Sequence, residues 1–410
     1  MLTEKQKLDE LAKLGVELNQ VKDLDILMER VLRDARRFVN ADAGSIYIRQ
    51  GDRLDFSYTQ NDTLQRQLPD GEKLIYSTFT IPIDEKSIAG YVAKTGRQLN
   101  LPDVYRIPAT EPYSFSKNFD HSSGYKTQSV FTVPLKTARN EILGILQIIN
   151  AQNESGNVIP FSRDTEKLLL HFASTASIAL ERAQMTRALL LRMIRMSEMR
   201  DPKETGAHVN RVAGYSVEIY EEWAKRRGLS KEEIDANRDS LRMAAMLHDV
   251  GKVAISDLIL KKPGRFNDDE YEIMKQHTVL GARMFVDVQS DFDAAACQVA
   301  LNHHERWDGK GYPGHVEVES GKPLPGCEMP NGSAKGKAAE EIPLYGRIVS
   351  LADVFDALSS ARIYKEAWQE SDVLETIEKE AGHQFDPELV NAFFAVLNVL
   401  RSIQERYQEE

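Results

Sequence analysis

The feature that most constrains the fold is an unbroken helical pattern from Phe161 to about Met199. Its seam residues recur at alternating spacings of three and four over about four heptads, the repeat of a coiled coil. The seam comprises Leu169, Phe172, Ala176, Ala179, Ala183, Thr186, Leu190 and Met193. Asp201-Pro202 interrupts the pattern. We interpret residues 161–199 as a helix that joins two domains, and its seam favours a parallel dimer over a lone bridging helix.

The 410 residues leave room for more than one hydrophobic core. Strand patterns precede the long helix, whereas nearly everything after residue 203 has a helical pattern. We therefore predict an amphipathic helix at residues 1–23, an α+β domain at 24–160, the linker helix at 161–199 and an all-α domain at 200–400. The first helix places Leu8, Leu11, Leu14, Leu18 and Val21 on one stripe, which indicates either packing on its own domain or a dimer contact.

The α+β domain carries alternating patterns typical of an antiparallel sheet. Residues 45–58 predict a hairpin that turns at Gly51-Asp52, and residues 129–135 and 142–149 predict two further strands. A short helix is predicted at 88–95, followed by a polar, aromatic loop at 102–127 that contains His121.

The segments Ile88–Gly96, Ser129–Leu135 and Ile142–Asn150 resemble stretches of the GAF family of small-molecule sensor domains. The resemblance covers about residues 24–183 and implies an antiparallel sheet flanked by helices. Cyclic-nucleotide-binding members carry Asn-Lys, Phe and Asp-Glu, where this sequence has Asn150-Ala151, Phe161 and Thr165-Glu166. The missing Lys and Asp argue against a cyclic nucleotide, and the sequence leaves the ligand unknown. His121 is either a ligand contact or a solvated loop residue, and residues 1–160 alternatively serve dimerisation alone.

The charge balance limits the possible partners. The 52 Lys and Arg against 63 Asp and Glu give a net charge of −11, which disfavours binding to DNA or RNA polymers. A phosphate ligand would therefore require metal ions or a few well-placed cations. Two cysteines make no disulfide framework, and no apolar stretch is long enough for a membrane span. We expect a cytoplasmic protein without a membrane contact.

Histidines are concentrated after residue 203, where seven of the nine lie. Several stand beside acidic residues or beside each other, at spacings suited to metal binding: Glu204 with His208, His248 with Asp249, His277, His303 with His304, and Asp353. An adjacent pair converges on one cluster only where the backbone turns, and Gly251 favours such a turn. Imidazoles mixed with carboxylates suit first-row metals, and eight ligands exceed the capacity of one ion. Two or three ions would activate water and neutralise a phosphate, which indicates metal-assisted phosphoester hydrolysis.

Three blocks in this half resemble the HD-GYP phosphodiesterases over about residues 198–400. They are His248–Lys252, His303–Pro313 and Leu351–Lys365. The resemblance implies an all-α phosphodiesterase that hydrolyses cyclic di-GMP to pGpG or GMP. It also implies that the eight residues above are metal ligands, with Asp249 bridging two ions and Glu204 and His208 completing a three-metal site. Iron and manganese are the expected metals.

By the same resemblance, Asp249 and Lys252 are the catalytic residues, and Lys252, Tyr312, Arg362 and Lys365 contact the substrate. Lys252 would hold a phosphate oxygen, and Arg362 suits bidentate phosphate or guanine recognition. We also predict that Glu305 orients a ligand imidazole. The loop at 314–342 is longer than in the family and is either a lid or partner-binding flap or a tolerated insertion.

The sequence thus predicts a GAF-regulated, homodimeric cyclic di-GMP phosphodiesterase that is joined through the 161–199 helix. Two alternatives remain open. The chain is a catalytically weak sensor of cyclic di-GMP, or it hydrolyses another cyclic dinucleotide such as cyclic GMP-AMP.

Overall fold

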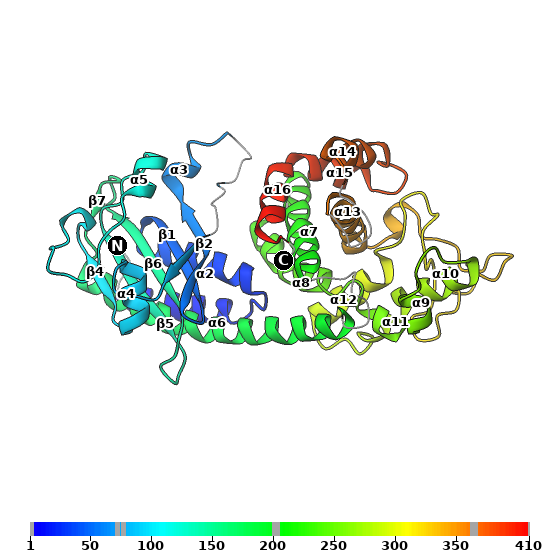
Figure 1. Ribbon diagram of the computed structural model, residues 1–410, viewed down its shortest axis with the longest axis horizontal. Coiled ribbons are helices and arrows are strands. Elements are labelled where there is room, and N and C mark those ends of the chain that lie inside the picture. The colour runs from blue at the N-terminus through cyan, green and yellow to red at the C-terminus, as the bar shows by residue number, and fades with distance from the viewer. Residues whose placement is uncertain (1–3, 70–73, 75–78, 199–205, 361–367, 409–410) are drawn as a thin grey trace. The chain divides into compact units, whose positions relative to one another are not determined.

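The computed structural model describes residues 4–69, 74, 79–198, 206–360 and 368–408 (Figure 1). The chain divides into two compact units, residues 1–187 and 188–410, which are treated separately below. In the described ranges, no helix combines the length and the apolar character needed to cross a bilayer.

The first unit is built on one antiparallel sheet. Its strand order is β3-β2-β1-β6-β5-β4, with β7 paired to β6. The strands are β1 Ala41–Gln50, β2 Arg53–Asn61, β3 Thr80–Pro82, β4 Leu99–Leu101, β5 Val130–Lys136, β6 Ile142–Gln152 and β7 Val158–Ile159. The predicted hairpin is confirmed, because β1 and β2 pair antiparallel across Gly51, whose φ of 61° suits glycine. The other two predicted strands are β5 and β6.

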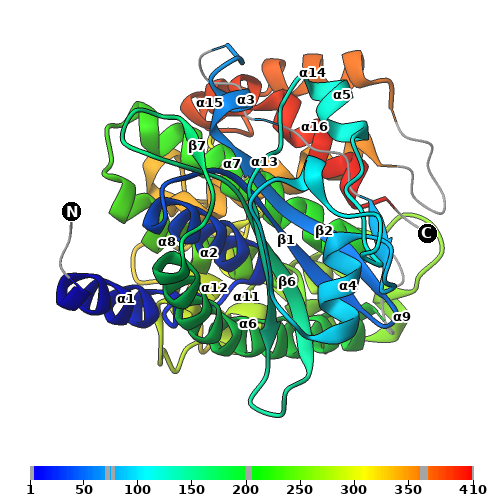
Figure 2. The same ribbon diagram turned by 90° about the vertical axis from the view of Figure 1, so that its left-hand side faces the viewer.

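Helices cover both faces of this sheet (Figure 2). On one face, α2 (Leu24–Phe38) and α6 (Arg163–Glu198) pack on Ile46, Ile48 and Ile148. On the other face, α4 (Ile88–Thr95) packs on Tyr47 and its neighbours. Tyr47 points away from Ile46 and Ile48 because successive side chains of a strand point to opposite faces of the sheet. Short helices α3 (Asp62–Gln65), η1 (Val104–Arg106) and α5 (Asn118–Ser123) complete the unit. The predicted loop at 102–127 therefore contains η1 and α5.

The helix α1 (Glu4–Leu18) packs on its own unit. Leu18 is fully buried there, and Leu11 and Leu14 contact the same core, so the first of the two interpretations of this stripe is confirmed.

The long helix forms as predicted, but the dimer interpretation of its seam is wrong. Five seam residues are buried in the core of the first unit: Leu169, Phe172, Ala176, Ala179 and Ala183. Leu190 is buried in the core of the second unit. A helix that packs along one stripe on its own chain shows the same spacings of three and four as a coiled coil. These six seam residues are consequently not available to a second chain, and the other two, Thr186 and Met193, are half-buried.

The described residues of the second unit form helices joined by turns, as predicted, apart from the long segment between α12 and η3. Helices α7, α8, α12 and α13 pack together around a core that contains Tyr215, Leu241, Val299 and Phe355. The helices are α7 Gly206–Arg226, α8 Lys231–Ala245, η2 Val250–Ala254, α9 Asp257–Leu260, α10 Asp268–Lys275, α11 His277–Arg283, α12 Asp291–Asn302, η3 Ala339–Glu341, α13 Leu344–Ser359, α14 Glu370–Lys379, α15 Pro387–Ala395 and α16 Leu397–Arg406.

Candidate metal centre

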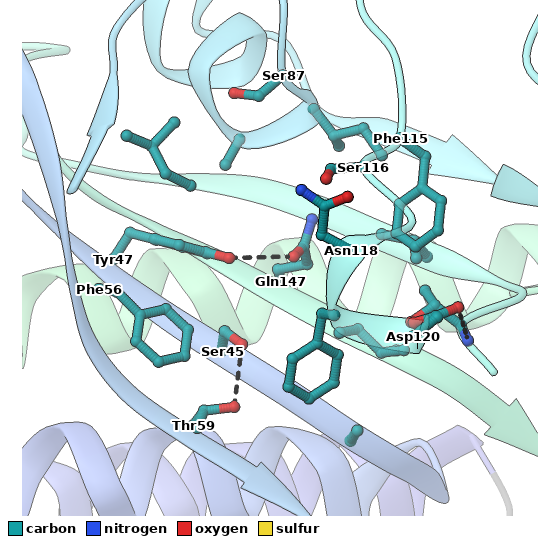
Figure 3. A pocket seen from close by; sticks show the side chains of 18 of the residues that line it. Ser45, Tyr47, Phe56, Thr59, Ser87, Phe115, Ser116, Asn118, Asp120 and Gln147 are labelled. Carbon is teal, nitrogen blue, oxygen red and sulfur yellow. Dashed lines mark hydrogen bonds between the residues drawn. The ribbon is translucent and has the colours of Figure 1, made fainter. Parts of the chain in front are cut away.

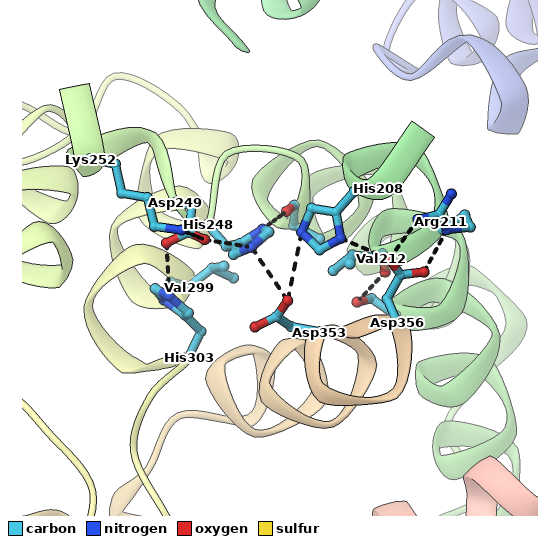
Figure 4. Close-up of polar contacts among 12 residues, drawn as sticks. His208, Arg211, Val212, His248, Asp249, Lys252, Val299, His303, Asp353 and Asp356 are labelled. Atoms are coloured by element: carbon cyan, nitrogen blue, oxygen red, sulfur yellow. Dashed lines mark hydrogen bonds and ion pairs between the residues drawn. The ribbon is translucent and has the colours of Figure 1, made fainter. Parts of the chain in front are cut away.

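Five segments of the second unit bring their ligand residues to one place (Figure 4). His208 lies in the first turn of α7, and His248 and Asp249 lie between α8 and η2. His277 is the first residue of α11, and His303 and His304 follow α12 directly. Asp353 lies in the middle of α13. The structure thus gathers seven of the eight predicted ligands, while Glu204 lies outside the described residues.

The seven residues form two ligand groups. The first consists of Asp249, His277, His303 and His304, and the second of His208, His248 and Asp353; within each group the ligand atoms lie within 4.8 Å of one another. In the first group, the Nε2 atoms of His277 and His303 are 3.1 and 3.6 Å from Oδ1 of Asp249. In the second, Oδ1 of Asp353 is 3.6 Å from Nε2 of His208 and 3.9 Å from Nε2 of His248.

Asp249 connects the two groups. Its Oδ1 faces the first group, whereas its Oδ2 lies 3.3 Å from Nε2 of His248 in the second. This is the position that a carboxylate bridging two adjacent ions would need, and it agrees with the predicted role. Nζ of Lys252 lies 2.8 Å from the same Oδ2.

The histidine rings are held by their Nδ1 atoms. Nδ1 of His248 is 2.8 Å from the carbonyl oxygen of Ala245, and Nδ1 of His277 is 2.7 Å from that of Met274. Nδ1 of His303 lies 3.1 Å from two carbonyl oxygens of α12. A carbonyl oxygen can only accept, so each Nδ1 carries the proton and each Nε2 directs a lone pair into the cluster.

The donor set fits metal ions. Nε2 of His277 lies 3.4 Å from Nε2 of His303 and 3.1 Å from Oδ1 of Asp249, so three lone-pair atoms face one another. Oδ1 of Asp249 is buried and accepts no hydrogen bond. Such an arrangement is repulsive unless a cation lies between the atoms. Imidazole nitrogens with carboxylate oxygens match first-row divalent metals.

Protonation states in the cluster also favour metal binding. Burial lowers the pKa of both His303 and His304, which keeps the two rings neutral at pH 7. Burial opposes ionisation of Asp249, but the neighbouring Lys252 outweighs it, and the pKa of that carboxyl lies well below its usual range. Asp249, His303 and His304 therefore carry free lone pairs at neutral pH, as coordination requires.

Gly251 acts differently from the expectation. The backbone φ of Gly251 is not positive. The chain turns because η2 begins directly after Asp249. A Cβ atom at Gly251 would lie 1.9 Å from the carbonyl oxygen of His277 and 2.4 Å from N of Gly281. Glycine is needed because η2 packs directly on the backbone of α11. This close contact brings Asp249 next to His277.

A buried ion pair that the sequence analysis missed supports the second ligand group. Asp356, which is only 1% exposed, lies 2.8 Å from Nδ1 of His208. It also accepts hydrogen bonds from Nε and Nη2 of Arg211, at 2.6 and 2.8 Å. Asp356 follows Asp353 by one helical turn and Arg211 follows His208 by one turn, so the spacing of three was the available signal.

The predicted role of Glu305 is wrong. Its carboxylate accepts hydrogen bonds from N of Gly314 at 2.6 Å and from N of Lys337 at 3.2 Å, and it orients no ligand imidazole by any described hydrogen bond. Gly314 and Lys337 are the two ends of the long loop. Glu305 therefore closes this loop beside the cluster.

The loop itself packs on the ligand-bearing helices. Val316 and Val318 contact Val279 and Ala300, which lie on α11 and α12. Nε of Arg283 donates to the carbonyl oxygen of Val318 at 2.8 Å. Because α11 begins with His277, the base of the loop forms part of the support of the centre.

Of the predicted substrate contacts other than Lys252, only Tyr312 lies in the described ranges. The ring of Tyr312 stacks on that of His304, with centroids 4.8 Å apart. Burial raises the pKa of the Tyr312 hydroxyl, which therefore remains a hydrogen-bond donor. Arg362 and Lys365 lie outside the described residues.

Two neighbours of Tyr312 were not singled out from the sequence. Nζ of Lys275 lies 4.7 Å from the ring centroid of Tyr271 and 5.5 Å from that of Tyr312. Lys275 is two residues before His277, so the cation and both rings lie at the edge of the first ligand group. In the first unit, by contrast, His121 is exposed on α5.

Comparison with known proteins agrees with this architecture. Residues 23–180 match the model of the GAF domain family, and residues 205–358 match that of the HD domain family. Together with the observed sheet and helices, these matches confirm the predicted fold class.

Three curated relatives each match about half of the chain. A cyclic di-GMP phosphodiesterase of Vibrio cholerae is 37% identical over 219 residues, which are 52% of this chain and 40% of the relative. A cyclic di-GMP phosphodiesterase response regulator of Xanthomonas campestris is 39% identical over 206 residues, 50% of this chain and 47% of the relative. A 3'3'-cGAMP-specific phosphodiesterase of Vibrio cholerae is 37% identical over 188 residues, 46% and 30% of the two chains. The chain spans less than half the length of each of these relatives.

Proposed function

We propose that this chain, in which a GAF domain precedes an HD domain, is a metal-dependent phosphodiesterase that hydrolyses cyclic di-GMP to pGpG, GMP or both. The observation that carries the proposal is the pair of ligand groups that share Asp249. The similarity to cyclic di-GMP phosphodiesterases supports the choice of substrate. Two ions, or three if Glu204 takes part, would fit the donor set, and iron or manganese suits its imidazoles and carboxylates.

The metals, when bound, would supply Lewis acidity and a nucleophilic water at neutral pH. Residues of the chain would supply the charge and the hydrogen-bonding groups that contact the substrate. Lys252, whose Nζ lies 2.8 Å from Asp249, places a positive charge beside the cluster, where a phosphate oxygen would bind. Tyr312 offers a protonated hydroxyl and a ring face near His304. We also propose that Arg362 and Lys365 contact the substrate, in line with the motif they occupy.

A second candidate substrate is cyclic GMP-AMP. The specific observation in its favour is the 37% identity to a 3'3'-cGAMP-specific phosphodiesterase. The two dinucleotides differ in one base, and both phosphodiester groups are the same. The metal centre treats both alike, and groups at its edge such as Tyr271, Lys275 and Tyr312 would discriminate between them.

The deciding experiment is product analysis after anaerobic purification and loading with Fe²⁺ or Mn²⁺. Each dinucleotide is incubated with the protein, and pGpG, GMP and AMP are separated by chromatography. Asp249→Ala should abolish turnover, whereas Asp268→Asn, an exposed carboxylate on α10, should not change it. Faster turnover of cyclic GMP-AMP would select the second candidate. Absence of turnover with full metal loading would instead favour the sensor.

We further propose that the first unit regulates the enzyme and that the chain is a homodimer. Because the buried seam of α6 is occupied, the contact would use the opposite face. Ile178, Met185, Leu189 and Met196 are exposed there at spacings of seven, four and seven residues, and each is more than half exposed. Such a stripe would pair with its copy on a second chain.

A further inference from the structure

The first unit contains a cavity that the proposed chemistry does not use. Its volume is about 530 Å³, enough for a small organic ligand. Strands β1, β2 and β6 form its floor, and α4, α5 and residues 114–116 form its walls (Figure 3). The question is which class of molecule this cavity would accept.

Aromatic rings provide much of the lining. Phe56 and Phe79 stack with centroids 4.4 Å apart, and Tyr47 meets Phe56 edge to face at 5.5 Å. Phe79 and Phe119 both line the cavity, yet they are 48% and 43% exposed. Exposed aromatic faces that converge on a cavity are apolar surface that a flat ring would bury at a gain of free energy.

The polar lining consists of hydroxyl and amide groups. Ser45 and Thr59 share a hydrogen bond of 3.1 Å, and the hydroxyl of Tyr47 points at Oε1 of Gln147 at 3.5 Å, a weak contact. Ser116, Asn118 and Gln147 also line the cavity (Figure 3). Amides and hydroxyls both donate and accept, which matches a heteroaromatic ring with mixed groups on its edge.

The charges around the cavity oppose an anion. The described lining residues include no lysine or arginine, and their one carboxylate is Asp120. Asp120 is 5% exposed and accepts hydrogen bonds from Tyr105 and from N and Oγ1 of Thr127, at 2.7 to 2.8 Å. Burial raises the pKa of Tyr47 to about 12, so this phenol is uncharged at neutral pH.

The buried arginine behind the lining does not reverse this balance. Arg36 donates to Oε1 of Gln60, a lining residue, at 2.7 Å. Its Nη2 also pairs with Asp62 at 2.5 Å and donates to the carbonyl oxygen of Asp42. The charge of Arg36 is therefore compensated outside the cavity.

We propose that this cavity binds a neutral, planar heteroaromatic molecule through its aromatic rings and its amide and hydroxyl groups, and that it excludes nucleotides and other phosphorylated or carboxylated ligands. The ring of such a ligand would lie against Phe56, Phe79 and Phe119. Its polar edge would face Asn118 and Gln147.

Matched probe pairs test this charge rule on the full-length protein. Each pair shares one ring system and differs in charge: adenosine with cyclic AMP, guanosine with cyclic GMP, and indole-3-acetamide with indole-3-acetate. Isothermal titration calorimetry should show at least one neutral probe binding below 1 mM, with its charged partner at least tenfold weaker. The proposal is overturned if a charged probe binds as tightly as its neutral partner, or if none of the six binds at 1 mM.

A charge reversal locates the binding. Asn118 is exposed at the cavity, so Asn118→Lys should fold normally and place a cation there. The charged member of a binding pair should then gain about fivefold in affinity, since one nearby unit charge contributes on the order of 1 kcal/mol. Asn157→Lys, which adds the same charge on the exposed turn between β6 and β7, should leave the affinity unchanged. Equal effects of the two variants would place the binding elsewhere and overturn the proposal.

Discussion

At the scale of single residues, the centre depends on side chains that hold the ligands as much as on the ligands themselves. The candidate metal ligands were recognisable because histidines are scarce and stood beside aspartates or beside each other. The pairing of Asp356 with Arg211 was not recognisable, because the spacing of three from Asp353 and from His208 does not say which residues pair between two helices. Their pairing depends on how α7 and α13 pack, as does the contact of Asp356 with His208.

We expect Asp356→Asn to weaken binding of Mn²⁺ by about 10- to 100-fold, because the carboxylate no longer fixes the ring of His208. The free Mn²⁺ signal in electron paramagnetic resonance measures this affinity. Asp386→Asn is the matched control, since Asp386 also forms a buried pair, with Arg347 at 2.6 Å, but contacts no ligand residue. A loss of Mn²⁺ affinity that is equal in both variants would contradict the assigned role.

The loss of folding stability caused by Asp356→Asn should depend on pH. Burial opposes ionisation of Asp356, but Arg211 and His208 outweigh it and lower its pKa. Since the folded pKa lies below the unfolded one, the carboxylate stabilises the fold above the ordinary carboxyl pKa and loses this contribution as the pH falls. In metal-free urea unfolding, Asp356→Asn should cost about 3–5 kcal/mol at pH 7. The difference from wild type should shrink below about pH 4.

Lys252 is the residue whose role in turnover is most directly testable. Lys252→Met keeps the length of the side chain and removes the charge, so we expect kcat for cyclic di-GMP to fall about 100-fold with the metal content unchanged. Metal analysis and steady-state kinetics on the same preparation measure both. Lys261→Met, at an exposed lysine of the same segment, should leave kcat unaffected. An unchanged kcat in Lys252→Met would show that its charge does not act on the substrate.

At the scale of elements, the position of the ligand residues depends on a close backbone contact between two helices and on hydrogen bonds that hold the ends of the long loop together. Gly251 lets η2 lie against α11, and Glu305 ties together Gly314 and Lys337 across the long loop. The sequence shows a loop rich in glycine and proline, but it does not show that the loop packs on the helices of the centre. If the loop is a lid, the part that moves must lie beyond Val316 and Val318, because these residues pack on the helices.

We expect Glu305→Gln to loosen this loop, because an amide cannot accept from both backbone N–H groups as the carboxylate does. Limited trypsin digestion should cleave after Lys322, Lys335 or Lys337 several-fold faster than in wild type. Glu317→Gln is the control, since Glu317 bonds Ser320 within the loop. Equal cleavage rates in Glu305→Gln and wild type would show that Glu305 does not hold the loop closed.

At the scale of the whole molecule, the question is what the outer face of α6 contacts. If it forms the proposed homodimer, Leu189→Glu should shift the protein from dimer to monomer in analytical ultracentrifugation, because it buries a charge in the interface. Asp268→Lys, a charge reversal at an exposed residue of α10 outside this face, should leave the protein a dimer. A monomeric wild type at 50 μM would rule out this interface.

The sequence by itself determined what depends on neighbours along the chain: the hairpin at Gly51, the long helix, the helical second half and the residue types of a metal centre. Periodicity and adjacent pairs are local properties, so they can be identified without knowing the fold. Tertiary structure decided which stripe of α6 is buried, and that Asp356 and Glu305 hold other parts in place. These are contacts between segments tens to hundreds of residues apart, and complementary shape and charge, rather than spacing, select them.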